Sequence, residues 1–318
     1  MERPDARRLP MLSEPALYVI KPGPLTLFQD AGRPGYRRYG VPVSGAMDQF
    51  SYRAANWLAG NPEDAVALEV LMHGLTLEAL RDLTVAFAGA DLGVEVDARA
   101  AECWCTVRIP RGAKIRFAGR RSGGRAYMAV AGGFDAPRFL GSAATFVKGR
   151  MGRPLQAGDI LLAGVAPGCA RERRLPPEDR PALEQPQTIR VILGPQDGCF
   201  SRRGIQTFLD SDYKVSPHSD RQGFRTEGPP IEAVRGPGII SDPTPLGAIQ
   251  VPGDGRPIIL QRDGQVTGGY AKIAKVIAAD LDWFGRLMPG DSLRFEAVPR
   301  EAALAALEQV SRRRFRSA

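Results

Sequence analysis

Short apolar or alternating segments, separated by turns, recur along most of the chain. They stand at 17–20, 25–28, 83–89, 103–109, 114–119 and 126–133, and again at 188–194, 239–242, 248–251 and 257–260. Branched and aromatic side chains that alternate with polar ones suit half-buried strands, and breaks rich in glycine and proline suit turns. The pattern predicts a mainly β protein with short helices.

Apolar residues recur at helical spacing in only a few places. We predict helices after Asp48 and after Ser201, each of which can cap a helix start, and an amphipathic helix near the C-terminal end. The apolar positions that define them are Phe50, Ala54, Trp57 and Leu58; Ile205, Phe208 and Leu209; and Leu304, Leu307 and Val310. Capping explains Asp48 without a functional role, so a structural and a functional interpretation of this residue both stay open.

A polar, charged and proline-rich stretch at 169–187 divides the pattern into two β units. A turn-then-strand phrase recurs on both sides of it (PRGAKIRF, QAGDILLA and MPGDSLRF), which is weak internal repetition consistent with two related units. We therefore predict a disordered leader at 1–16, a first domain at 17–182, a second domain at 187–299, and a C-terminal helix with a basic tail at 300–318.

The net charge of +8 raises the question of nucleic-acid binding. Only six of the 43 basic residues are lysine, the arginines are scattered, and aromatic residues do not interleave with them as a stacking surface requires. No apolar run approaches the roughly 18 residues of a membrane span, and the N-terminal residues lack the apolar core of a secretory signal. We expect a cytoplasmic protein that binds neither nucleic acid nor membrane.

Residues 29–48, QDAGRPGYRRYGVPVSGAMD, combine turn-forming glycine and proline with polar side chains at fixed offsets. Glycine lets a backbone bend and approach a ligand closely, and proline stiffens what lies between. Such a segment is either an ordinary turn-rich connection or a loop that holds polar side chains in one place. We call it the early block.

A late block at 246–280 contains the phrase DGQVTGGY. Thr267 can cap a helix whose first turn includes Gly268 and Gly269, and a bare helix start suits a carboxylate, a phosphate or a developing oxyanion. Asp263 and Gln265 flank this point, and Ile273, Val276 and Ile277 would be buried by the helix. The alternative is a capped helix that follows a β-turn and has no ligand.

The sequence lacks the motifs that several kinds of enzyme and cofactor require. Two histidines and four unpatterned cysteines do not suggest a metal site, and neither a P-loop nor a dinucleotide-binding glycine motif occurs. In GAMDQ, Asp48 stands where a biotin carrier has its lysine after AM, so any biotin must come from a partner. We predict no metal.

The early block, the segment AANWLAGNPEDAVALEV at 54–70 and the late block together resemble a family with several names. These are the C subunit of 5-oxoprolinase, allophanate hydrolase subunit 2-like protein and the biotin-dependent carboxyltransferase domain of urea carboxylase. The resemblance covers about 17–298. It implies two cyclophilin-like β-barrel domains that face each other across a cleft lined by both blocks, and a substrate with an amide N–C=O group.

The resemblance also implies candidate site residues, because carboxylates, amides and guanidinium groups can hold such a group. As catalytic residues we predict Asp30, Asp48 and Asp263. As substrate-binding residues we predict Gln29, Arg33, Ser44, Gln196, Ser216, Arg221, Gln250, Gln265, Thr267, Gly268, Gly269 and Tyr270. The chain departs from the family pattern at Val266, where a threonine is usual, and at 146–159, where the glycine-rich loop is shorter.

As function we predict the C subunit of an ATP-dependent 5-oxoprolinase, which opens 5-oxoproline to glutamate together with the A and B-like subunits of that enzyme. ATP would activate the lactam oxygen as co-substrate of the complex. One alternative is a biotin-dependent carboxyltransferase that acts on urea or a related amide, with carboxybiotin supplied by a partner. Another is a non-catalytic protein that binds and antagonises a kinase inhibitor.

Overall fold

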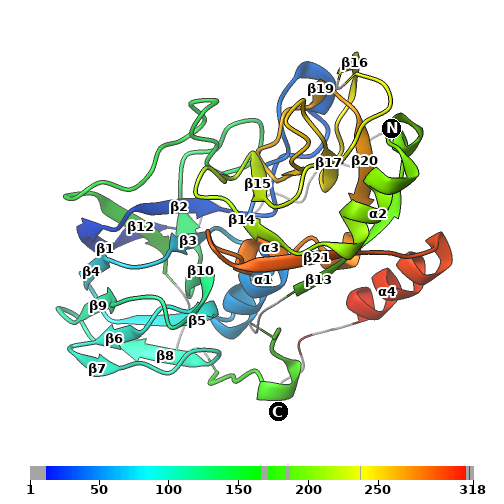
Figure 1. The fold of residues 1–318 in the computed structure, drawn as a ribbon. Helices are drawn as coiled ribbons and strands as arrows, with labels where there is room; N and C mark the ends of the chain where they lie inside the picture. Colours follow the sequence, from blue (N-terminus) through cyan, green and yellow to red (C-terminus); the bar gives the residue numbers. More distant parts are fainter. Residues whose placement is uncertain (1–11, 166–170, 183–186, 237, 313–314, 316–318) are drawn as a thin grey trace.

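The structure is a computed structural model that describes residues 12–165, 171–182, 187–236, 238–312 and 315. It contains two β-rich units, which occupy the left and the upper right of Figure 1. Among the described residues, no helix has the length and apolar character needed to cross a membrane.

The first unit consists of two antiparallel sheets packed face to face. The seven-stranded sheet has the order β11 (Phe134–Asp135), β12 (Ile160–Gly164), β1 (Ser13–Pro22), β4 (Leu75–Ala79), β9 (Lys114–Phe117), β6 (Val94–Val96) and β7 (Arg99–Ala100). The five-stranded sheet has the order β2 (Leu25–Gln29), β3 (Ala67–Leu71), β10 (Ser122–Val130), β5 (Leu83–Asp91) and β8 (Thr106–Ile109).

Strand alternation decides which side of the five-stranded sheet each residue faces. Met128 and Val130 of β10 point into the core between the sheets, whereas Tyr127 and Ala129 point to the other face. Helix α1 (Gln49–Leu58) covers that other face and contacts β3, β5 and β10. Because both faces are covered, β10 is buried along almost its whole length.

The second unit is a closed barrel. Its strand order is β13 (Gln187–Leu193), β20 (Lys272–Val276), β17 (Ala248–Gln250), β18 (Ile258–Leu260), β15 (Gly223–Glu227), β14 (Tyr213–Val215) and β21 (Ser292–Ala297). Helix α2 (Arg202–Asp210) packs on the barrel through Phe208, whose ring stacks on that of Phe295 with centroids 4.5 Å apart. Strands β16 (Gly238–Pro243) and β19 (Thr267–Tyr270) form a separate two-stranded sheet.

Four short 3₁₀ turns and two more helices complete the described part of the chain. The turns are Arg37–Tyr39, Pro177–Asp179, Asp197–Cys199 and Ala278–Asp280, and the helices are α3 (Trp283–Arg286) and α4 (Arg300–Arg312). Helix α3 lies against β10 of the first unit, so the barrel contributes directly to the contact between the two units.

The mainly β fold and the helices after Asp48 and Ser201 are confirmed. The helix predicted from Thr267 onward is wrong, because this stretch forms β19 and β20. Strand β20 pairs with β13 on one side and with β17 on the other. These ladder bonds with distant segments override a local spacing that also fits a helix.

The structure adds detail to three of the predicted segments, and it moves the start of the first unit. Strand β1 begins at Ser13, so residues 13–16 belong to a sheet, while 1–11 lie outside the described residues. Thr106 N donates to Arg173 O at 2.9 Å, so this part of the proline-rich stretch packs on the first unit, inside the predicted bounds of the first domain; residues 169–170 and 183–186 are not described. In the predicted tail, Phe315 packs against Trp57, and the remaining residues after 312 are not described.

The C-terminal helix forms as predicted, but it docks through small residues. Ala303 and Ala306 are buried, whereas Leu304, Leu307 and Val310 stay 50%, 39% and 38% exposed.

Candidate functional site

The early and late blocks meet where the two units join. The Arg37 guanidinium donates to Thr244 O, two residues before the late block, at 2.6 Å and across 207 positions of sequence. Ser44 N donates to Arg262 O at 2.9 Å. In Figure 1 the blue early block accordingly lies beside β16 and β19. The predicted association of the two blocks is therefore present in the fold.

The path of the early block depends on tight turns. A Cβ on Gly45 would lie 2.9 Å from backbone atoms of Ala31, and the φ of +89° is one that glycine adopts readily. The Asp30 carboxylate anchors the segment around Ser142, because it accepts hydrogen bonds from Ser142 Oγ at 2.6 Å and from Ala143 N at 2.7 Å. These contacts assign Asp30 a structural task, and its catalytic role stays a prediction.

A buried ionic network spans the junction and contains two other predicted site residues. Arg221 donates to Asp263 at 2.9 Å, to Glu69 of β3 at 2.5 Å, and to Gly45 O at 2.6 Å. Burial by itself lowers the pKa of Arg221, but the Asp263 and Glu69 carboxylates outweigh it and raise the pKa above its ordinary value. Arg125 Nε lies 3.7 Å from Glu69 Oε1, so two arginines and two carboxylates form one charge-balanced cluster across the two units.

Asp48 lies in a second buried cluster. Its carboxylate accepts from Ser51 N at 3.0 Å as the N-cap of α1, and from Arg286 Nε at 2.7 Å. The neighbouring Asp282 accepts from the next two backbone N–H groups of α1. Burial, and then repulsion from Asp48, raise the pKa of Asp282. Asp48 thus has the capping role that the sequence left open, together with an ion pair between the units.

Three predicted site residues carry buried polar atoms with no hydrogen-bond partner among the described residues: Gln29 Oε1, Arg33 Nη1 and Ser44 Oγ. Other polar atoms of these residues do form hydrogen bonds; for example, Gln29 Nε2 donates to Thr145 O at 3.1 Å. Burial lowers the pKa of Arg33. Buried polar atoms in proteins are normally satisfied, and ordered water is a common partner. The buried side of the early block therefore contains polar atoms that no described residue satisfies.

An open pocket at the junction contains three other predicted residues. Its volume is about 140 Å³, and we call it the glutamine pocket; it is lined by Lys148, Asp220, Gln222, Gly223, Arg225, Gln250, Ile258, Leu260, Gln265 and Tyr270. Gln265 Nε2 donates to Gln250 Oε1 at 3.2 Å, and Gln250 Nε2 donates to Tyr270 O at 3.3 Å. A chain of amide groups therefore forms one side of the pocket.

The structure places Thr267, Gly268 and Gly269 differently from the prediction. They lie on β19 rather than at a helix start, so the predicted anion site of free helix N–H groups is absent. A Cβ on Gly268 would lie 2.6 Å from Gln250 Nε2. The glycine leaves room for the glutamine that lines the pocket.

Gln196 and Ser216 do not line the glutamine pocket as it is described. Gln196 Nε2 donates to Asp242 at 3.1 Å, beside the ion pair of Asp242 with Lys272 at 2.8 Å. The hydrogen bonds from Lys272 and then Gln196 lower the pKa of Asp242. Ser216 lines a neighbouring hollow of about 520 Å³, which shares Arg225 with the glutamine pocket.

Three residues of the junction, Glu69, Lys148 and Gln222, were not predicted from the sequence. Glu69 was recognisable as a charged residue inside the apolar strand ALEVL, and such a residue is rarely buried without a partner. Lys148 and Gln222 belong to loops of different units and carry no local signal that joins them. No group of three or more potential metal ligands occurs among the described residues.

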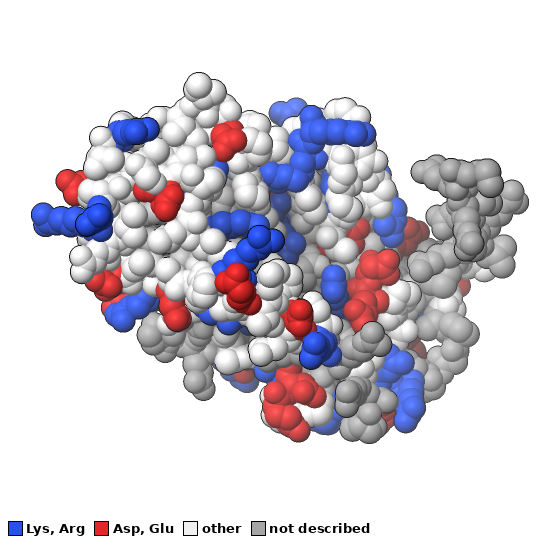
Figure 2. Space-filling view, turned by 90° about the vertical axis from the view of Figure 1, so that its right-hand side faces the viewer, with Lys and Arg blue, Asp and Glu red and all other residues white. Residues whose placement is uncertain are grey.

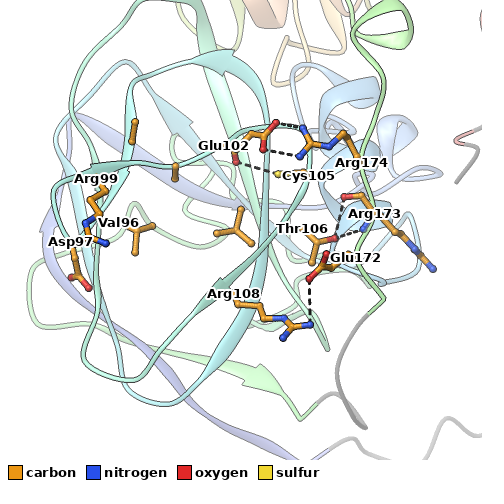
Figure 3. A pocket seen from close by; sticks show the side chains of 13 residues that line it. Val96, Asp97, Arg99, Glu102, Cys105, Thr106, Arg108, Glu172, Arg173 and Arg174 are labelled. Carbon is orange, nitrogen blue, oxygen red and sulfur yellow. Dashed lines mark hydrogen bonds and ion pairs between the residues drawn. The ribbon is translucent and has the colours of Figure 1, made fainter. Parts of the chain in front are cut away.

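A larger hollow of about 1040 Å³ lies elsewhere, at the far end of the first unit from β19 (Figure 1). Figure 3 shows two of its arginines facing acidic partners: Arg174 points to Glu102, and Arg108 points to Glu172, which lies 3.4 Å away. No predicted site residue lines it. Figure 2 shows basic and acidic side chains interspersed over another face of the molecule.

Comparisons with known proteins agree with the geometry. Residues 39–297 match the family described as carboxyltransferase domain, subdomain A and B. The chain is 34% identical to the C subunit of 5-oxoprolinase of Escherichia coli (strain K12) over 302 residues, which cover 93% of this chain and 96% of that protein.

Two solved structures have the same fold. TTHA0988 matches with a TM-score of 0.82 at 37% identity, over 92% of this chain and 56% of that one. The Kluyveromyces lactis urea carboxylase matches with a TM-score of 0.88 at 31% identity, over 94% of this chain and 29% of that one. The chain spans only part of each of these two proteins. The resemblance predicted from the two blocks is confirmed, and the chain belongs to the carboxyltransferase domain family with subdomains A and B.

Proposed function

We propose that the chain is the C subunit of an ATP-dependent 5-oxoprolinase, which opens the lactam ring of 5-oxoproline to give glutamate. The observation that carries this proposal is the glutamine pocket, where Gln222, Gln250 and Gln265 gather around a small space at the junction of the two units. A side-chain amide offers both a donor and an acceptor, which is the complement of a planar N–C=O edge.

The size of the pocket supports a small substrate. A volume of about 140 Å³ corresponds to a handful of water molecules, since each occupies about 30 Å³ in the liquid. Drug-sized ligands occupy pockets of about 300–1,000 Å³. The pocket therefore suits a small amide better than a nucleotide.

ATP consequently has no place in this pocket. We propose that it binds elsewhere in a complex with the A and B-like subunits of the enzyme, where it serves to activate the lactam oxygen. The chain's own contribution is to hold the amide group and to keep the junction of the two units rigid. Asp30, Asp48 and Asp263 then support the site through the loops and ion pairs that they hold.

Sequence identity to a relative supports this choice of enzyme. The chain is 34% identical to the E. coli 5-oxoprolinase protein and 31% identical to the K. lactis urea carboxylase. A carboxyltransferase that acts on urea is the second candidate, favoured by the TM-score of 0.88 to that carboxylase. Urea also carries the N–C=O edge, and in that case a partner would supply carboxybiotin.

The test is to purify the chain together with its A and B-like partner subunits and to measure glutamate formed from 5-oxoproline with and without ATP. Gln265 is exposed and lines the pocket, so Gln265→Leu removes one amide with little effect on folding. We expect the KM for 5-oxoproline to rise about 2- to 13-fold, the equivalent of one neutral hydrogen bond.

The matched control is Gln206→Leu, an exposed glutamine on α2 outside the pocket, which should leave the KM unchanged. No ATP-dependent glutamate from the complete wild-type complex would refute the proposal. Urea-dependent ATP turnover with a biotin carboxylase and a biotin carrier would support the second candidate instead.

A further inference from the structure

A tight hairpin of the first unit reaches across to the barrel beside the glutamine pocket. Phe146 N donates to Met151 O at 2.8 Å, and Met151 N donates back to Phe146 O at 3.2 Å. A Cβ on Gly149 would lie only 2.3 Å from the Phe146 ring, so the turn closes against that ring. Lys148 therefore belongs to a turn whose backbone is fixed by the two hydrogen bonds between Phe146 and Met151.

The Lys148 ammonium contacts the barrel on the rim of the pocket. Its Nζ lies 2.6 Å from Asp220 Oδ2 and 2.5 Å from Gln222 Oε1, and its side chain also lines the pocket. An ammonium group has three donors. Two are used by the barrel, which leaves one for a ligand.

The charges that line the pocket are not balanced. Lys148 and Arg225 are basic, Asp220 is the acidic residue in the lining, and the other lining residues are uncharged. An acceptor oxygen that carries negative charge is the group that best completes this arrangement, because charge-assisted hydrogen bonds are about twice as strong as neutral ones.

We propose that Lys148 is a specificity-determining residue that selects small amides carrying a carboxylate, such as 5-oxoproline, over neutral amides such as urea. The glutamine side chains hold the amide edge, and the free donor of Lys148 holds the carboxylate at the rim. The inference rests on the proposed function, and it assigns to the short loop at 146–159 the task of substrate selection.

The test uses the complete complex and two lactams, 5-oxoproline and its neutral analogue 2-pyrrolidinone. The Lys148–Asp220 pair is exposed, 58% and 44% by side chain, so its loss costs at most about 1 kcal/mol and Lys148→Met stays folded. The KM and kcat for glutamate formation are measured, together with the inhibition constant of 2-pyrrolidinone. The matched control is Lys275→Met, an exposed lysine of β20 that does not line the pocket.

We expect Lys148→Met to raise the KM for 5-oxoproline about 10- to 150-fold, the range for a hydrogen bond to a charged group. The kcat and the inhibition constant of 2-pyrrolidinone should change little. Lys148→Arg keeps the charge and should recover part of the loss. Lys275→Met should match the wild type.

An equal loss for both lactams would overturn the inference, because Lys148 would then only hold the hairpin against the barrel. An unchanged KM in Lys148→Met would also overturn it while leaving the proposed function intact. If the wild-type complex forms no glutamate, the proposed function fails and this inference fails with it.

Discussion

The buried cluster of Arg221, Glu69 and Asp263 makes a specific prediction about stability. Arg221→Met removes the one positive charge that both carboxylates contact at hydrogen-bond distance, along with the bond to Gly45 O at 2.6 Å. Glu69 keeps Met47 N and the Tyr127 hydroxyl as donors, both at 2.8 Å. Asp263 has no comparable replacement among its described hydrogen bonds, so the substitution leaves a buried carboxylate without its ion-pair partner.

The expected cost follows from that imbalance. Removing one partner of a buried ion pair typically costs about 3–5 kcal/mol, because the remaining charge stays desolvated. The net stability of a protein is only about 5–15 kcal/mol, so the free energy of unfolding should fall by about a fifth or more. Arg221→Lys keeps the charge but cannot reproduce the forked geometry, and it should lie between Arg221→Met and the wild type.

The assay is urea denaturation followed by tryptophan fluorescence and circular dichroism, with the free energy of unfolding extrapolated to water. The matched control is Arg294→Met, which breaks an exposed pair with Asp212 at 2.9 Å and should cost less than about 1 kcal/mol. A value for Arg221→Met within about 1 kcal/mol of that control would refute the view that this cluster holds the two units together.

Two further predictions concern the same junction. A Cβ on Gly285 would lie 2.6 Å from Asp48 N, so Gly285→Ala should cost about 1–3 kcal/mol and lower the Tm, whereas Gly198→Ala, with open space around it, should not. The raised pKa of Asp282 means that its ionisation opposes folding as the pH rises above its usual value of 3.8. Relative to the wild type, Asp282→Asn should therefore become progressively more stable from about pH 4 upward, as measured by urea midpoints across pH; a difference independent of pH would contradict this sign.

Much of the fold was accessible from the sequence, because alternation is a local signal. In β9, Ile115 and Phe117 are buried and Lys114 and Arg116 are exposed, as the alternation of KIRF indicates. The stretch that begins at Thr267 was misassigned for the opposite reason. The spacing of Ile273, Val276 and Ile277 fits a helix, and only pairing with distant strands makes it β19 and β20.

The candidate site was accessible only in part. The two blocks were identified together, and Gln250, Gln265 and Tyr270 do line one pocket. A carboxylate in a turn looks the same in sequence whether it caps a helix, as Asp48 does, or faces a substrate. Lys148 and Asp220 form an ion pair across 72 positions of sequence, and no local sequence pattern predicts such a pair.

The most direct test of the whole account is a crystal structure of the complete complex with 5-oxoproline bound. We expect the lactam amide beside Gln250 and Gln265, in the pocket of about 140 Å³, with its carboxylate within hydrogen-bond distance of Lys148 Nζ. Ordered 5-oxoproline bound away from the junction of the two units, with this pocket empty, would contradict the account.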